Sequence, residues 1–123
     1  MNLPRVQLIA GDHRLKAYVA RTEEERALGL MHRQQMAPDE GMLFVCDEPE
    51  VQSFWMKDTP LPLSVAFLDE DGTIVNIDDM EPHTLDGHAS ERPVRYVLEV
   101  NQGWFDDKGV AAGLRLEGPP FLK

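Results

Sequence analysis

The sequence contains a single cysteine, few aromatic residues and no long hydrophobic run. One cysteine cannot form a disulfide within the chain, and Cys46 ends an apolar run, which is typical of a small buried side chain. No apolar run approaches the roughly 18 residues that a membrane-spanning helix needs, so we predict no membrane span. The N-terminus lacks a basic start followed by an apolar stretch, so the sequence as given shows no signal peptide.

Basic residues are also scarce. The net charge is −10, from 22 acidic against 12 basic residues. Because neutralising phosphates supplies most of the affinity for nucleic acids, this balance predicts that nucleic acid is not a partner. The hydrophobic fraction of 42% and the charged fraction of 28% are ordinary for a soluble globular protein. A length of 123 residues favours a single domain, residues 1–123.

Short runs of alternating or continuous apolar residues predict about eight strands. These runs cover residues 6–10, 13–20, 41–46, 51–57, 63–68, 73–80, 94–100 and 114–117. Turn signals lie between several of them, and the strongest is Asp71–Gly72, because that pair tolerates a positive φ. The long polar stretch 81–93 is predicted to be a surface loop.

Helical signals are few. Thr22 and Glu25 fit a capping box, which predicts a short helix near residues 22–31 that Gly29 weakens. A helical turn closed by glycine is expected near residues 103–108. Because strands and helices do not alternate, we predict a mostly β (α+β) fold, a small antiparallel barrel-like or sandwich domain.

The common catalytic and metal-binding motifs are missing. The four histidines lack the paired spacing of a zinc site, and the methionines are scattered over separate elements, as core residues are. There is no glycine-rich phosphate loop and no nucleophile elbow. We therefore predict no metal and no cofactor, and we assign no catalytic residue.

Lys57 is the most unusual polar residue, because it follows Phe54, Trp55 and Met56. If it were buried, it would need a carboxylate, and Glu99 is the best candidate. Glu99 points away from the apolar face of its strand, which predicts that it faces a different environment. A Lys57–Glu99 pair could be purely structural or could serve acid–base chemistry, and the sequence leaves both open.

Four stretches resemble the uncharacterised bacterial and archaeal family called domain of unknown function 192. They are ERALGLMHR (25–33), GMLF (41–44), FWMKDTPLPL (54–63) and YVLEVNQGWF (96–105). The resemblance implies a compact, mostly β, barrel-like domain with one short helix, and it supplies no activity. Many similar proteins carry a leader, which implies an exported or periplasmic location if a leader was removed, and otherwise a cytoplasmic one. The chain departs from the family pattern at Asp58, where asparagine is common, and at Ser64, where aspartate is common.

We therefore expect a small binding or accessory module with a shallow cleft for a small polar or anionic ligand, such as a saccharide. The candidate site residues are Arg33, Trp55, Lys57, Asp58, Thr59, Glu99 and Asn101. Lys57 and Arg33 would anchor the ligand, and Trp55 would stack on it. Two alternatives remain: an enzyme that uses Lys57 as acid or base with Glu99, and a structural or protein-partner domain without a ligand pocket. The sequence does not determine the partner or the oligomeric state.

Overall fold

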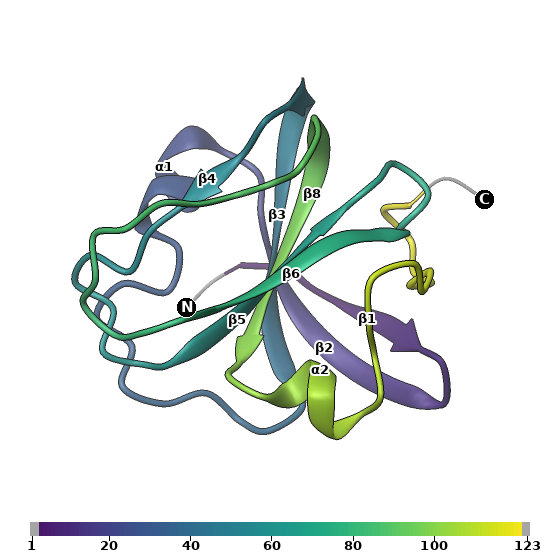
Figure 1. Cartoon of the computed structure of the whole chain (residues 1–123), viewed down its shortest axis with the longest axis horizontal. Helices are drawn as coiled ribbons and strands as arrows, with labels where there is room; N and C mark the ends of the chain where they lie inside the picture. The colour runs from purple at the N-terminus through teal and green to yellow at the C-terminus, as the bar shows by residue number, and fades with distance from the viewer. Residues whose placement is uncertain (1–2, 122–123) are drawn as a thin grey trace.

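The computed structural model describes residues 3–121 (Figure 1). Its strands are β1 (Arg5–Ala10), β2 (His13–Ala20), β3 (Glu40–Glu50), β4 (Ser53–Phe54), β5 (Leu63–Leu68), β6 (Ile74–Met80), β7 (His88–Ala89) and β8 (Val94–Asn101), and its helices are α1 (Glu23–Leu28) and α2 (Trp104–Asp107). Six strands form one sheet in the order β1-β2-β3-β8-β5-β6, and β4 pairs with β7 in a second, small sheet. The predicted mostly β fold, with one short helix and a later helical turn, is confirmed.

The large sheet is mixed and not purely antiparallel. β2 and β3 run parallel, whereas the other pairs in the sheet are antiparallel. A parallel pair needs a long connection so that the chain can return in the same direction. Residues 21–39, which contain α1, provide that connection.

Four of the predicted segments differ in the structure. The strand expected over 51–57 is reduced to β4. The strand expected over 41–46 is longer, because β3 continues to Glu50 after a register shift. The strand expected at 114–117 forms two isolated bridges, Ile9 to Glu117 and Thr73 to Arg115. The predicted loop 81–93 contains β7. These segments lie where the chain leaves the large sheet, so their pairing depends on tertiary neighbours and not on local pattern.

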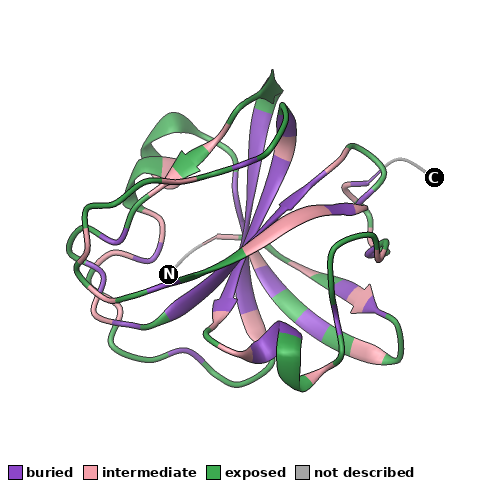
Figure 2. Cartoon of the chain, in the orientation of Figure 1, coloured by how far each residue is buried: buried purple, intermediate pink, exposed green. Residues whose placement is uncertain are grey.

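The large sheet has a core on each face. One core contains side chains from all six strands together with α2 and the C-terminal segment, so it is the inside of the curled sheet. The second core lies on the outer face, mainly over β3, β5 and β8, and includes residues from the connections that cover this face. Figure 2 shows these three strands as buried over most of their length.

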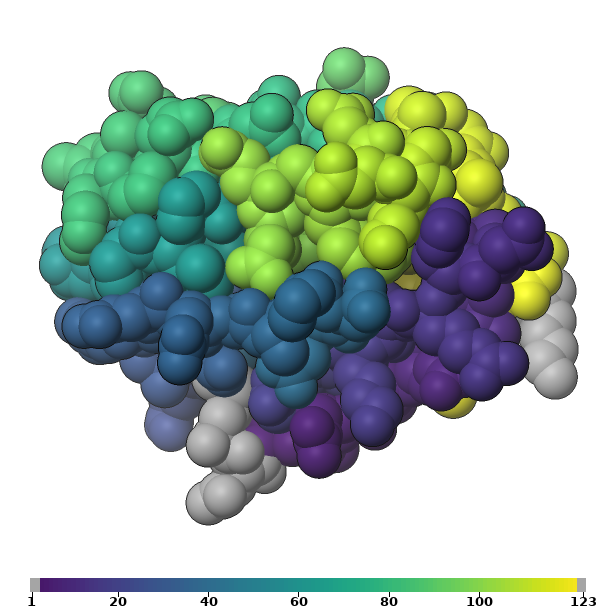
Figure 3. Space-filling view, turned by 90° about the horizontal axis from the view of Figure 1, so that it is seen from below, coloured from purple at the N-terminus to yellow at the C-terminus, as the bar shows by residue number. Residues whose placement is uncertain are grey.

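The two edges of the curled sheet do not pair with one another. The C-terminal segment lies between them: the amide of Ile9 donates to the carbonyl of Glu117 at 2.9 Å, and the amide of Leu116 donates to Gly72 at 2.9 Å. In Figure 3 the chain that follows β8, lime to yellow, lies beside the purple N-terminal hairpin. Among residues 3–121, none of the helices has the length and apolarity that crossing a membrane requires.

Candidate functional site

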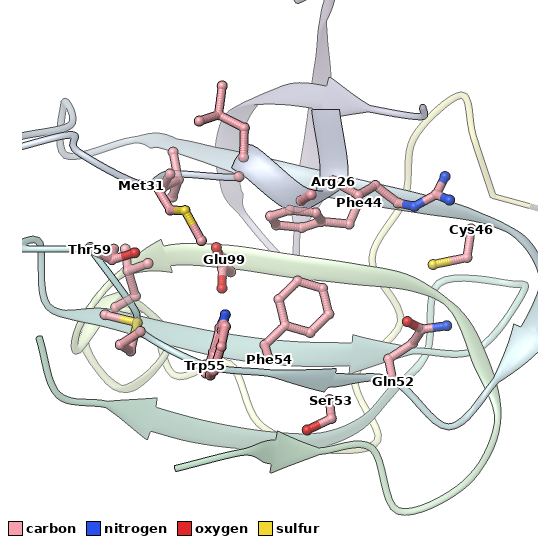
Figure 4. A pocket seen from close by; sticks show the side chains of 16 residues that line it. Arg26, Met31, Phe44, Cys46, Gln52, Ser53, Phe54, Trp55, Thr59 and Glu99 are labelled. Atoms are coloured by element: carbon pink, nitrogen blue, oxygen red, sulfur yellow. The ribbon is translucent and has the colours of Figure 1, made fainter. Parts of the chain in front are cut away.

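A pocket of about 290 Å³ lies between the outer face of the large sheet and the layer that covers it. One wall comes from α1 and the residues that follow it, and the opposite wall comes from β4 and the residues on either side of it (Figure 4). It is lined by Arg26, Ala27, Leu28, Gly29, Leu30, Met31, Phe44, Cys46, Gln52, Ser53, Phe54, Trp55, Met56, Thr59, Leu63 and Glu99. Most of these side chains are apolar, so the pocket favours a ligand with an apolar body.

Glu99 is the acidic group of this pocket, and its place follows from its strand. β8 is flanked by β3 and β5, and Glu99 stands directly opposite Met42 and Val65. Directly paired residues point to the same face, so the carboxyl group lies on the outer, apolar face of the sheet. Glu99 is only 4% exposed. In Figure 4 its carboxyl group points into the pocket toward Trp55.

No hydrogen bond or ion pair of the Glu99 carboxyl group is found within residues 3–121. Because no fully buried side-chain oxygen there lacks a partner, its oxygens reach the space of the pocket. Burial alone raises its pKa from 4.5 to about 8, because the charged form loses its water and gains no compensating cation. At neutral pH the group is therefore mostly a neutral acid, which can donate one hydrogen bond.

Local sequence signals form the first wall. Thr22 caps α1, with its hydroxyl oxygen accepting from the amide of Glu25 at 3.0 Å, while Glu25 accepts from the Thr22 amide at 3.0 Å. The helix ends at Gly29, whose φ of 50° places it in the left-handed region that glycine tolerates best. A β-carbon on Gly29 would lie 3.4 Å from the ring of Phe44, so the wall packs closely on the sheet.

The second wall is held from outside by residues 81–93. Met56 donates its amide to Thr84 at 3.0 Å, and Ser90 donates its amide to Gln52 at 2.8 Å. The rings of Phe54 and Phe44 meet edge to face with centroids 4.8 Å apart, so this wall packs against β3 beside the pocket. The long polar loop therefore supports the pocket without lining it.

The model of the family named domain of unknown function 192 (DUF192), described as Uncharacterized ACR, matches residues 6–118. The chain belongs to this family. A solved structure from Sinorhizobium meliloti, given the provisional description of transcription regulator, is 45% identical with a TM-score of 0.87, and the match covers 93% of this chain and 92% of that one. A protein of unknown function from Novosphingobium aromaticivorans is 31% identical with a TM-score of 0.83, covering 92% and 83%. No curated protein matches.

The segments that carry the DUF192 resemblance meet at this pocket. All its lining residues except Cys46, Gln52 and Ser53 lie within 25–33, 41–44, 54–63 and 96–105. These stretches are far apart in the sequence, and the fold brings them together around one carboxyl group. The stretches that resemble the family therefore form most of the pocket lining as well as parts of the fold.

Three of the seven predicted site residues line the pocket: Trp55, Thr59 and Glu99. Trp55 is 48% exposed at the pocket, whereas Thr59 is buried and donates its hydroxyl to the carbonyl of Lys57 at 3.0 Å. The predicted cleft combined residues of the tryptophan segment with Glu99, and both line this pocket.

The other four predicted residues do not line the pocket. Arg33 lies over the ring of Tyr18 at 5.6 Å, and Asn101 donates to the carbonyl of Ala37 at 3.1 Å. Asp58 is exposed with a φ of 54°, a conformation that asparagine and aspartate adopt more easily than most residues.

The expected pairing of Lys57 with Glu99 is wrong. Lys57 is exposed, and within residues 3–121 it forms no ion pair with Glu99. Its ammonium group lies over the ring of Trp55, 5.5 Å from the centroid. The physical reason is that a lysine stem can lie along apolar surface while its charge stays in water. Lys57 therefore does not have Glu99 beside it for acid–base chemistry.

Sequence reasoning missed much of the pocket wall, including Arg26, Met31, Phe44 and Phe54. In the sequence these residues have the pattern of ordinary helix or core residues. The one signal that could have identified them is that they lie in the stretches that resemble the family. Cys46 also lines the pocket, and burial raises the pKa of its thiol, which keeps it protonated. Within the described residues, no group of three or more His, Cys, Asp or Glu side chains could hold a metal ion.

Proposed function

We propose that this DUF192 chain is a binding module whose ligand occupies the Glu99 pocket. The observation that carries the proposal is a carboxyl group, 4% exposed and without a partner among the described residues, that points into a pocket of about 290 Å³. Within the described residues no fully buried side-chain oxygen lacks a hydrogen bond, so the unpaired carboxyl oxygens open into the pocket, where a ligand can pair with them.

The lining of the pocket changes the class of ligand that we expect. A polar or anionic ligand, such as a saccharide, was expected to bind through Lys57 and Arg33, which lie outside the lining. The pocket instead sets one acid among apolar and aromatic side chains, with Arg26, Gln52, Ser53 and Thr59 as its other polar lining residues. This arrangement favours a small ligand that has an apolar body and one polar group next to Glu99. Trp55 keeps its proposed stacking role, because its exposed ring lies at the pocket.

A role in binding nucleic acid is not part of this proposal. The Sinorhizobium relative is described provisionally as a transcription regulator. The net charge of −10 on this chain opposes phosphate binding, and the proposed site offers an acid where a phosphate would need a base. Any regulatory role would then act through a small ligand or a protein partner.

A thermal-shift screen with a broad set of small amines, alcohols, acids, amides and sugars tests the proposal, because a ligand that binds only the native state raises Tm. We expect some compounds to raise Tm of the wild type and of Lys57→Met, but not of Leu30→Trp, which fills the pocket wall. Lys16→Met is the matched charge control, since Lys16 is exposed on β2. Leu30→Trp must first show a cooperative unfolding transition.

If Leu30→Trp does not fold, Leu28→Trp replaces it, because Leu28 lines the pocket and is 56% exposed. Compounds that raise Tm equally in the wild type and in the folded pocket-filling variant would contradict the pocket as the site. If the rise in Tm were lost in Lys57→Met but kept in Lys16→Met, the ligand would instead bind at Lys57. A screen in which no compound raises Tm of the wild type would also count against the proposal.

A further inference from the structure

We propose that the ligand of the Glu99 pocket is a small organic ammonium ion, and that Glu99 releases its proton to solvent when this cation binds. The inference rests on the proposed function and names the chemical class of its ligand. Three observations support it: the unpaired carboxyl group, the aromatic rings that line the same pocket, and the lack of a competing cation beside it within residues 3–121.

The carboxyl group of Glu99 favours a cation over a neutral partner. A neutral ligand gains one hydrogen bond from the protonated acid, whereas an ammonium ion gains charge-assisted hydrogen bonds from the carboxylate, which are about twice as strong. An anion is disfavoured, because it would meet a group that becomes negative when it ionises. The net charge of −10 also attracts cations toward the molecule.

The rings around Glu99 favour the same class of ligand. Phe44, Phe54 and Trp55 all line the pocket. Aromatic faces carry negative potential and attract ammonium groups within about 6 Å. The molecule already contains one such contact, because the ammonium group of Lys57 lies 5.5 Å from the centre of the Trp55 ring.

The protein's own charges leave the carboxyl group available. Of the other lining residues, Arg26 and Cys46 are titratable, and both lie toward the other end of the pocket in Figure 4. The Nη1 atom of Arg26 donates to the carbonyls of Val45, at 3.0 Å, and of Arg21. No titratable side chain of β4, β5 or residues 29–31 lines the pocket, and Lys57 and Asp58 lie outside the lining.

The size of the pocket limits the body of the cation. An apolar cavity of about 150 Å³ accepts one benzene molecule. The pocket here is about 290 Å³, so it has room for one ring, or a branched chain of similar volume, together with an ammonium group. Benzylamine is a suitable probe, and benzyl alcohol and benzoate present nearly the same body with a neutral or negative group.

The binding step conserves charge and protons. The neutral acid of Glu99 and the ammonium ion become a carboxylate–ammonium pair, and one proton passes to the buffer. Binding should therefore tighten about tenfold for each pH unit between 6 and 7 and level off above the pKa of about 8. Calorimetry in two buffers with different ionisation heats measures the released proton directly.

The test compares the three probes at millimolar concentration on the wild type and on Glu99→Gln, at pH 6, 7 and 8. Benzylamine should bind the wild type more tightly than the other two by about tenfold or more at pH 8, and proton release should approach one per ligand at pH 6. At pH 8, Glu99→Gln should bind benzylamine at least tenfold more weakly than the wild type, and its affinity should not change with pH. The far-ultraviolet spectrum confirms that the variant is folded.

The outcomes separate this inference from the proposed function. If benzyl alcohol or benzoate binds as tightly as benzylamine, the cation inference is wrong and the pocket remains a binding site. If none of the three binds, or if benzylamine binds without proton release, the inference is also wrong, and the broad screen alone decides the proposed function. Were Glu99→Gln to bind benzylamine as the wild type does, the cation would have to lie elsewhere.

Discussion

Glu99 is an acid on a central strand whose other side chains are mostly buried and apolar. An ionised carboxylate in such surroundings is costly, so the folded protein keeps the proton that the unfolded chain would lose. The consequence is a dependence of stability on pH. It has the opposite sign to that of the capping residue Glu25, whose pKa is lowered by hydrogen bonds from the amides of Thr22 and Arg21.

The pH dependence gives a prediction for Glu99→Gln. The pKa of Glu99 is about 8 in the folded protein against an ordinary value of 4.5. The protein is therefore most stable below about pH 4.5, and the contribution of Glu99 to the free energy of unfolding is lost as pH rises from there through 8. We expect the free energy of unfolding of the wild type to fall by about 3 to 5 kcal/mol more than that of Glu99→Gln between pH 5 and pH 9. Urea denaturation of both proteins at several pH values measures this difference.

Glutamine is the appropriate replacement because it has nearly the same shape and cannot ionise. Subtracting its curve removes the titration of all other groups, including Asp71, whose pKa is lowered by hydrogen bonds from Thr73. Parallel curves of the free energy of unfolding against pH for the two proteins would mean that Glu99 is ionised in the folded state. A cation or hydrogen-bond donor would then have to stabilise its carboxylate in the pocket.

At the scale of elements, α1 forms a pocket wall although it is short and has no buried residue. A helix of this length gains little from propagation, so its caps and its tertiary contacts determine whether it forms. The capping box of Thr22 and Glu25 satisfies amides at the start of the helix, and Arg26 ties it to the carbonyl of Val45 at 3.0 Å. The wall is therefore sensitive to a single hydroxyl group.

Replacing Thr22 with alanine tests that sensitivity. The lost cap should cost about 1 kcal/mol, mostly as local opening of α1, because the helix buries little surface. Amide hydrogen exchange at Arg26 and Gly29, whose amides donate within the helix, should accelerate roughly fivefold. Thr22→Ser keeps the hydroxyl and should exchange as the wild type does. Equal exchange in the alanine and serine variants would show that the cap does not hold the wall.

At the scale of the whole molecule, the C-terminal segment completes the curled sheet. It hydrogen-bonds to β1 on one side and to the turn before β6 on the other, and Tyr96 donates its hydroxyl to the carbonyl of Pro120 at 2.7 Å. The ring of Phe121 packs against that of Tyr96 with centroids 5.1 Å apart. Because these contacts span the chain, we expect the two ends of the domain to unfold together.

A pair of glycine substitutions measures what this closure contributes. Gly72 and Gly11 both have positive φ, 91° and 62°, but only a β-carbon on Gly72 would meet the C-terminal segment, 2.5 Å from the carbonyl oxygen of Leu116. We expect Gly11→Ala to cost about 1 kcal/mol and Gly72→Ala at least about 2 kcal/mol more. Chemical denaturation measures both. Equal costs would mean that the C-terminal segment can move away without loss.

Much of the fold could be predicted because its signals are local. The capping box at Thr22, the Asp71–Gly72 turn and the alternation along β8 each specify conformation within a few residues. The parallel pairing of β2 with β3 could not be predicted in this way. It depends on how residues 21–39 cross the sheet, which is decided by packing between distant segments.

The sequence by itself determined that Glu99 points away from the apolar side of its strand, because side chains on a strand alternate between faces. Only the tertiary structure decided what the second face contains. It placed the carboxyl group under α1 and Phe54 and left Lys57 at the surface over Trp55. Alternation is a property of the local backbone, whereas burial and charge pairing depend on segments that the sequence separates and folding brings together.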